Sequence, residues 1–202
     1  KLSAYSFALR TQGNDLHGTL FSTLELAGIK DFTPQSPNPK KIIFHCENFY
    51  IFCRTEHKPN AMIAVKEETL NVEVGSLIDV DVTLSNYRQC GLTKQEAQEY
   101  LEKHGKQATG TASRRYRLLN EEQFEEMYMR LFKQSGMKVH ESSFKRHPAC
   151  NFRMSKGDKF FNALEVNVKA TIEDLELFRA AWYNGIGRTK TYGFGKLRVE
   201  TI

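Results

Sequence analysis

The sequence predicts an α+β fold of two tandem ferredoxin-like (RRM-like) domains with a glycine-rich loop near the C-terminus. Strand-like and helix-like segments follow the order β-α-β-β in the first half, and β-α-β-β-α-β in the second. A polar stretch with a flexible loop separates the halves. We therefore expect a first domain at 1–86, a linker with a short helix at 87–112 and a second domain at 113–202.

The first domain is predicted from two kinds of apolar pattern. The expected elements are a strand at 2–10, a helix at 14–28, two strands or one bent hairpin within 41–55, and two further strands within 70–85. Leu16, Leu20 and Leu24 lie on one helical stripe. Apolar and polar residues alternate from Ile78 to Leu84, which is typical of a half-buried strand.

The elements of the linker and the second domain are predicted from a helix cap and from apolar patterns. The linker helix spans 92–105 and begins with a capping box, Thr93 and Glu96. The second domain is expected to hold a basic strand at 114–119, a helix at 120–136, a basic hairpin at 137–157, a strand at 160–170, a helix at 171–185 and a strand at 196–201. The apolar stripe of the 120–136 helix indicates core, not a cofactor site.

Composition narrows the class of protein. The chain has 202 residues, 40% of them hydrophobic, which is enough for a packed core. No apolar run approaches the ~20 residues of a membrane helix, and no signal-peptide pattern is visible. The cysteines, at positions 46, 53, 90 and 150, show neither C-x-x-C spacing nor a zinc-like pairing with histidine. We expect a cytoplasmic protein with free thiols and no metal.

The charge favours a polyanionic partner. The net charge is +5 with a pI near 9.0. Basic residues concentrate between Lys138 and Phe160, where Lys138, Lys145, Arg146, Arg153, Lys156 and Lys159 face only two acids, Glu141 and Asp158.

The stretch GIGRTKTYGFG, residues 185–195, contains four glycines and two cations. Glycine loses more backbone entropy on folding than other residues, so four glycines in one loop indicate a specific requirement for them. We interpret this requirement as a backbone that must approach phosphate closely. A P-loop or a Rossmann fingerprint connects a strand to a helix, whereas this loop connects a helix to a strand. The segment also matches part of an RRM strand signature, but too little chain follows it for that register. A helix cap at Gly185 is the structural alternative.

With the two ferredoxin-like halves, this loop resembles that of pre-crRNA processing endoribonucleases in the RAMP superfamily of CRISPR-associated proteins. Their pattern, G-hydrophobic-G-x-x-K-x-x-G-x-G, is met by Gly185, Ile186, Gly187, Lys190, Gly193 and Gly195. The stretch NDLHGTLFSTL is similar to the first helix of the Cascade-associated branch, and His17 occupies the position of the catalytic histidine. The stretch RRYRLLNEEQFEEMYMRLFKQSGMKV resembles the strand and helix that open the family's second half. Asn14 stands where some relatives have a helper tyrosine. Relatives from type IV systems share this architecture and can use arginines, so the resemblance covers both branches.

The resemblance implies cleavage of CRISPR repeat RNA without metal or cofactor. The ribose 2′-OH attacks the adjacent phosphate and leaves a 2′,3′-cyclic phosphate and a 5′-OH. His17 is the expected general base or acid, and the helix dipole in its first turn favours the neutral imidazole. Arg10 and Arg188 are the next catalytic candidates. The implied partners are precursor and mature crRNA and the other subunits of a Cascade-like effector complex.

RNA affinity is expected to come from phosphate contacts. The candidates are Arg114, Arg115, Arg117, Lys145, Arg146, Arg153, Lys156 and Lys190, with the glycines at 185, 187, 193 and 195. Arg114, Arg115 and Arg117 share one strand, so at most two of them can face one ligand.

Two other functions fit parts of the sequence. A non-catalytic RNA-binding RAMP subunit would have the same basic surface but would not cleave RNA. A nucleotide-binding regulator with paired ferredoxin-like domains would lack the basic hairpin.

Overall fold

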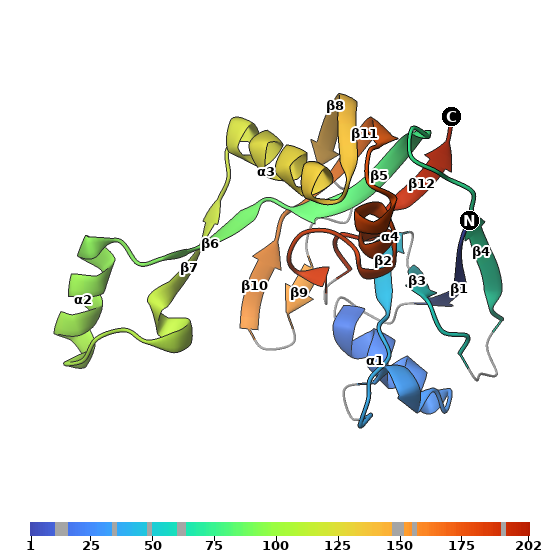
Figure 1. The fold of residues 1–202 in the computed structure, drawn as a ribbon. Helices are drawn as coiled ribbons and strands as arrows, with labels where there is room; N and C mark the ends of the chain where they lie inside the picture. Colours follow the sequence, from blue (N-terminus) through green and yellow to red (C-terminus); the bar gives the residue numbers. More distant parts are fainter. Residues whose placement is uncertain are drawn as a thin grey trace.

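The computed structural model describes residues 1–10, 16–33, 36–47, 50–59, 64–146, 152–154, 157–190 and 193–202. At 16, 17, 152–154 and 157–161 the description covers the backbone alone. Two four-stranded antiparallel sheets form the body, and an arm of two strands and a helix projects from it (Figure 1). The predicted α+β fold of two ferredoxin-like domains is confirmed.

The first sheet is built from β1 (Leu2–Arg10), β2 (Ile43–Glu47), β3 (Tyr50–Thr55) and β4 (Lys66–Leu70), in the order β2-β3-β1-β4. Helix α1 (Leu16–Leu26) covers one face, and a short 3-10 helix, η1 (Lys30–Phe32), follows it. Leu20 and Leu24 are fully buried and pack in one cluster with Phe7 and Leu9 of β1. The leucine stripe thus forms a helix because it has a sheet to pack against.

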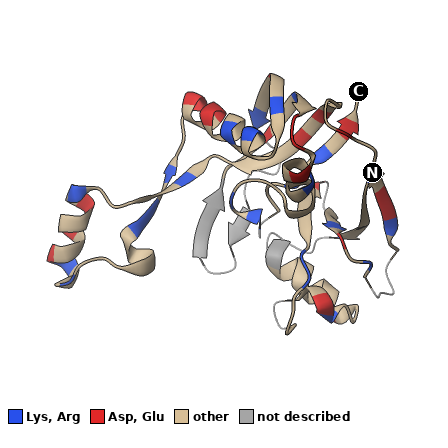
Figure 2. Ribbon diagram, viewed as in Figure 1, with Lys and Arg blue, Asp and Glu red and all other residues tan. Residues whose placement is uncertain are grey.

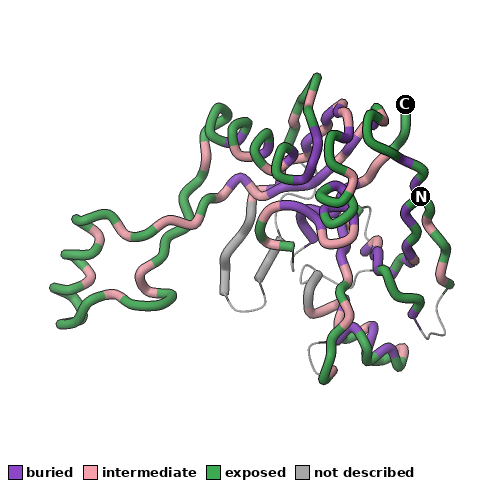
Figure 3. The backbone as a smooth tube through the Cα atoms, viewed as in Figure 1, coloured by how far each residue is buried: buried purple, intermediate pink, exposed green. Residues whose placement is uncertain are grey.

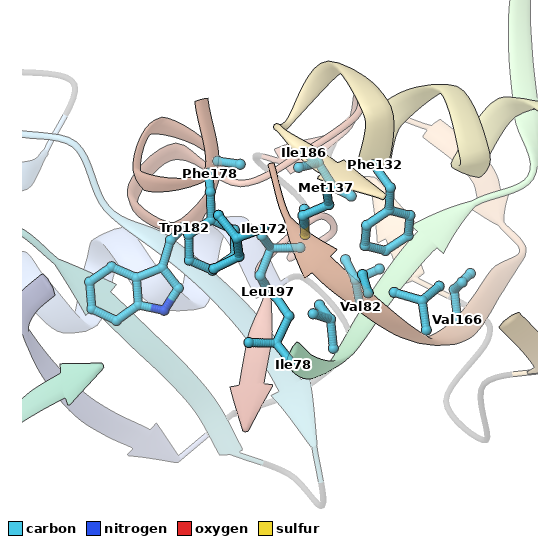
Figure 4. Close-up of a cluster of buried hydrophobic side chains, with 14 of the residues drawn as sticks. Ile78, Val82, Phe132, Met137, Val166, Ile172, Phe178, Trp182, Ile186 and Leu197 are labelled. Carbon is cyan, nitrogen blue, oxygen red and sulfur yellow. The ribbon is translucent and has the colours of Figure 1, made fainter. Parts of the chain in front are cut away.

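The second sheet contains β5 (Leu77–Ser85), β8 (Met137–Arg146), β11 (Ala163–Ile172) and β12 (Arg198–Thr201), in the order β12-β5-β11-β8. Helices α3 (Glu121–Gln134) and α4 (Leu175–Asn184) cover one face. Phe178 and Trp182 of α4 pack in one cluster with Val82, Val166 and Leu197, as Figure 4 shows.

Strand pairing differs from expectation in three places. The strand at 77–85, which we assigned to the first domain, pairs with β11 in the second sheet. Strand β7 (Arg114–Leu118), expected to open the second domain, pairs instead with β6 (Tyr87–Gly91) in the arm. The expected hairpin at 137–157 does not form, because β8 pairs with β11, and β9 (Phe152–Met154) pairs with β10 (Gly157–Phe161). The periodicity of a segment identifies it as a strand, but the strand with which it pairs comes from a distant part of the sequence and is not specified by that periodicity.

The arm consists of β6, helix α2 (Lys94–His104), a 3-10 turn η2 (Gly110–Ser113) and β7. The predicted capping box is present, since Thr93 accepts a hydrogen bond from the Glu96 backbone and Glu96 accepts one from Thr93. No residue of α2 is buried, and the whole arm lies at the surface (Figure 3). The arm therefore contributes no apolar core of its own.

Two apolar clusters stabilise the body, one for each domain, and the glycine-rich loop contributes to both. Ile186 and Leu197 lie in the cluster of the second domain, whereas Phe194 lies in the cluster of the first. All three side chains are at most 4% exposed. In the part of the chain that the structure describes, no helix is long and apolar enough to cross a membrane.

Candidate nucleic-acid interface

The glycine-rich loop is held by backbone hydrogen bonds at its two ends. Gly185 ends α4 with a positive φ of 69°, and its N–H donates to the carbonyl of Ala181 at 2.7 Å. The N–H of Ile186 donates to the carbonyl of Gly195 at 2.9 Å, which closes the loop. The N–H of Gly195 donates to the carbonyl of Thr83 at 2.8 Å and fastens the loop to β5. The cap predicted as an alternative is therefore present within a closed loop.

Two of the loop glycines are required by protein packing. A Cβ on Gly195 would overlap the carbonyl of Ile186, and a Cβ on Gly185 would overlap the side chain of Ile43. Gly193 lies against the ring of Phe44, where a Cβ would come within 3.1 Å. Gly187 has more room, since its nearest neighbour would be the side chain of Leu131 at 3.3 Å. A backbone that approaches phosphate is thus best placed at Gly187, and RNA binding by these glycines stays a prediction.

The loop lies against the helix that carries His17. Phe194 shares one apolar cluster with Leu20 and Leu24 of α1. His17 is in the first turn of α1, three residues before Leu20. The side chain of His17 lies outside the described part of the structure, and its catalytic role stays a prediction.

A groove of about 680 Å³ runs beside the loop. Its walls are Gly187, Arg188 and Thr189 of the loop, the base of the arm, and the exposed face of α3. The charged groups that line it are three arginines and one acid: Arg88, Arg130, Arg188 and Glu126. Tyr87 and Tyr116 also line it, so the groove combines cations with aromatic rings, as nucleic-acid sites do.

The predicted arginines of 114–118 lie on the stem of the arm, and Figure 2 shows basic residues along both of its strands. Strand alternation places Arg115 and Arg117 on one side, with Arg114 and Tyr116 on the other. Arg117 forms an ion pair with Glu96 at 2.6 Å, and Arg115 donates to the carbonyl of Ala112 at 3.3 Å. Tyr116 lines the groove, as does its register partner Gln89, whereas the three arginines of β7 do not.

The other predicted residues are distributed more widely. Lys145 lies 3.4 Å from Glu165, and Arg146 ends β8. Arg188 and Lys190 are exposed in the glycine-rich loop. Arg153 is described by its backbone alone, and Lys156 lies outside the described residues.

Arg10 is separated from the helix of His17. Leu9 belongs to the cluster beneath α1, so the next side chain, Arg10, is on the opposite face of the sheet. The catalytic roles of Arg10 and Arg188 both stay predictions.

A family model described as CRISPR associated protein matches residues 9–200. The chain belongs to this family. Its fold is also that of several solved CRISPR proteins, while a comparison with curated proteins gives no match.

Three structures illustrate the likeness. The first is the CRISPR endoribonuclease Cse3 bound to a 19-nucleotide RNA, with 12% identity over 98% of both chains and a TM-score of 0.68. The second is the CRISPR-associated protein Cas6e from Escherichia coli K-12, with 12% identity over 100% of both chains and a TM-score of 0.67. The third is a chain of E. coli Cascade bound to a PAM-containing double-stranded DNA target, with 12% identity, coverage of 98% and 99%, and a TM-score of 0.57.

Two groove residues of this CRISPR-associated protein were not predicted. Arg88 falls in the predicted linker, and Arg130 in the helix predicted at 120–136, where no role was assigned to it. The signal for Arg130 is its spacing, because Gln123, Met127 and Arg130 recur along one side of α3 and all line the groove. In the described residues, no three His, Cys, Asp or Glu side chains gather as metal ligands.

Proposed function

We propose that this protein is an endoribonuclease that binds the stem-loop of a CRISPR repeat and cleaves precursor crRNA. Its family and its fold support the proposal, since structures of that fold include an endoribonuclease bound to RNA. The observation that supports it is the glycine-rich loop itself: its Phe194 shares one apolar cluster with Leu20 and Leu24 of α1, and its Arg188 lines an arginine-rich groove.

The chemistry follows from the groups near that contact. In the proposed reaction the ribose 2′-oxygen bonds to the adjacent phosphorus, and the bond from phosphorus to the 5′-oxygen breaks. His17 takes the proton of the 2′-OH or supplies a proton to the departing 5′-oxygen. Arg188, which is exposed on the groove wall, stabilises the extra negative charge of the phosphorane.

The groove supplies the affinity for the RNA stem. Arg88, Arg130 and Arg188 contact phosphates, and Gly187 leaves the loop backbone close enough to donate an N–H. The deep groove of an A-form helix is too narrow for ordinary side-chain readout, so shape and phosphate spacing select the stem. The arm, with arginines along β7, extends the contact beyond the groove. The cleaved crRNA stays bound, and the protein becomes a subunit of a Cascade-like complex.

Cleavage of a repeat RNA in EDTA tests the proposal. We expect products that end in a 2′,3′-cyclic phosphate and a 5′-OH, and no cut when the scissile ribose is replaced by 2′-deoxyribose. A scrambled stem of equal length is the control for specificity. Full cleavage of the deoxy substrate would exclude internal attack, and tight binding of intact repeat RNA without any cut would establish a non-catalytic subunit instead.

A further inference from the structure

The first sheet has an open face on the side opposite α1. Strand register places Phe52 beside His45 and Ala8, and Tyr50 beside Arg10, all on this face. At the other end of the same face, Leu2, Ala4 and Leu70 are covered by the core of the second domain. The face is therefore closed at one end and open at the end that holds the aromatic side chains.

Two of these aromatic residues lie on β3, a central strand of the sheet. Tyr50 is 45% exposed and Phe52 is half-buried, with ring centroids 6.2 Å apart. His45 stacks on Phe52 at 5.1 Å with the planes only 18° apart, which fixes the Phe52 ring. The neighbour of Phe52 on β1 is the exposed alanine Ala8, whose small side chain leaves space above the sheet. Aromatic rings on central strands of this β2-β3-β1-β4 sheet are the feature by which RRM domains stack bases.

The space above Ala8 is a cavity of about 450 Å³ that continues to β12. The charged residues that line it are four cations and two acids: Arg54, Lys66, Lys196, Arg198, Glu68 and Glu200. Arg54 and Glu68 form a bidentate ion pair with each other, with one of its two hydrogen bonds at 3.0 Å. Their charges therefore cancel within the cavity. Arg198 is paired with Glu165 at 2.8 Å, so Lys66 and Lys196 remain against Glu200, and this positive excess suits phosphate.

Lys196 forms part of the cavity wall and is 6% exposed. Its Nζ donates a hydrogen bond to Nδ1 of His45 at 3.2 Å, so it joins the cationic wall to the aromatic stack. Burial, together with the neighbouring Arg54 guanidinium, lowers the pKa of Lys196 to about 8. An ammonium so strongly buried beside another cation is stabilised by an incoming anion.

We propose that this aromatic platform, which consists of Tyr50, Phe52, Ala8 and Lys196, binds single-stranded RNA. Bases stack on Phe52 and Tyr50, and Lys196 and Lys66 contact phosphates. The proposal rests on the proposed function, because it assigns the platform to the nucleotides that flank the repeat stem. The platform holds RNA without cutting it, and the stem lies in the separate groove beside Arg88 and Arg188.

Binding of three labelled RNAs tests this assignment: the stem alone, the stem with a single-stranded extension, and a short oligouridine. Replacing Tyr50 and Phe52 with leucine should weaken oligouridine binding about tenfold or more, since each stacked base contributes on that scale. Affinity for the stem alone should not change. Tyr5→Leu is the matched control, because Tyr5 lies on the same sheet but on the opposite face.

The groove variant Arg88→Ala should show the reverse pattern, with weaker stem binding and unchanged oligouridine binding. Photocrosslinking of 5-iodouridine RNA should label the peptide that contains Tyr50 and Phe52. Circular dichroism and thermal melting confirm that each variant is folded. If wild-type protein does not bind oligouridine, or if the folded double variant binds it as wild type does, the platform proposal is overturned. Failure of the stem to bind or to be cut would overturn the proposed function and leave the oligouridine result standing.

Discussion

Arg54 of β3 lies over the indole ring of Trp182 in α4, with the guanidinium carbon 4.4 Å from the ring centroid. The same guanidinium donates to the backbone carbonyls of Trp182 at 3.2 Å and Leu197 at 2.8 Å. Arg54 thus belongs to the first sheet but binds the backbone of the second domain. Burial acts to raise the pKa of its partner Glu68, but the bonds and charge of Arg54 outweigh it and lower that pKa overall.

Arg54→Met should therefore destabilise the protein. The substitution keeps an apolar chain in place of the aliphatic stem but removes the guanidinium, which leaves Glu68 without its ion-pair partner and two carbonyls without this donor. We expect the free energy of unfolding to fall by about 3 kcal/mol, the scale of a broken buried ion pair. Urea denaturation measures it. Arg117→Met, which removes a partly exposed ion pair of the arm, should change stability little. Equal effects of the two variants would contradict the bridging role of Arg54.

Gly195→Ala should destabilise the protein more than Gly75→Ala. Both residues have a positive φ, 82° and 91°, so both alanines incur the same strain, about 1 kcal/mol. Nothing lies within 4 Å of the space a Cβ would take at Gly75, whereas at Gly195 it would overlap the Ile186 carbonyl. Thermal unfolding compares the two. A similar Tm for both variants would show that the loop relaxes around Gly195 and that packing does not require glycine there.

His17→Ala should lower the single-turnover cleavage rate by roughly 10²–10⁴-fold, the usual contribution of a general acid or base. Affinity for repeat RNA should stay the same, because a neutral imidazole supplies no charge to phosphate. His57→Ala is the control, since His57 is an exposed histidine that follows the first-sheet strand β3. A wild-type rate for His17→Ala would move the catalytic role to Arg188.

Arg188 and Lys190 should set part of the salt dependence of binding. Replacing both with alanine is expected to flatten the slope of log K against log salt by roughly one unit for each phosphate that the variant no longer neutralises. Titrations of stem RNA at several salt concentrations measure the slope. The double variant Lys41→Ala/Lys58→Ala is the charge-matched control, because both lysines are exposed and neither lines the groove. An unchanged slope in the double variant would mean that the loop serves only as packing between the two clusters.

Lys196 should make stability depend on pH. Its pKa is lowered from 10.5 to about 8 in the folded protein, so the unfolded chain holds more protons between these values. Stability contributed by this residue therefore rises as the pH increases from about 8 to 10.5, because the buried charge is lost first in the folded state. Urea denaturation of wild type and Lys196→Met across this range isolates the effect. Burial raises the pKa of the Cys53 thiol and the charge of Lys196 acts to lower it, so both proteins are compared in a Cys53→Ala background, which removes this coupled titration. A stability difference that does not change with pH would contradict this assignment.

Local patterns predicted the helices well and the strand partners poorly. The capping box at Thr93 and the apolar stripe of α3 are local, and both formed as expected. Pairing of β5 with β11, by contrast, joins residues 78 to 94 positions apart, from Ser85 with Ala163 to Leu77 with Thr171, and nothing in the alternation of either strand specifies the other. The groove was also beyond local inference, because Arg88, Arg130 and Arg188 come from three separate elements. Of the residues it contains, only Arg188 and Gly187 could be named from a motif.

The position of Phe194 has a consequence for folding during translation. The strands and helix of the first domain leave the ribosome early, but their core still lacks Phe194, and also Ala163, which is fully buried in it. The second sheet in turn lacks its edge strand β12 until residues 198–201 have been made. Neither domain can therefore complete its packing while the chain is short, and both reach their final structure together, when the same few residues emerge.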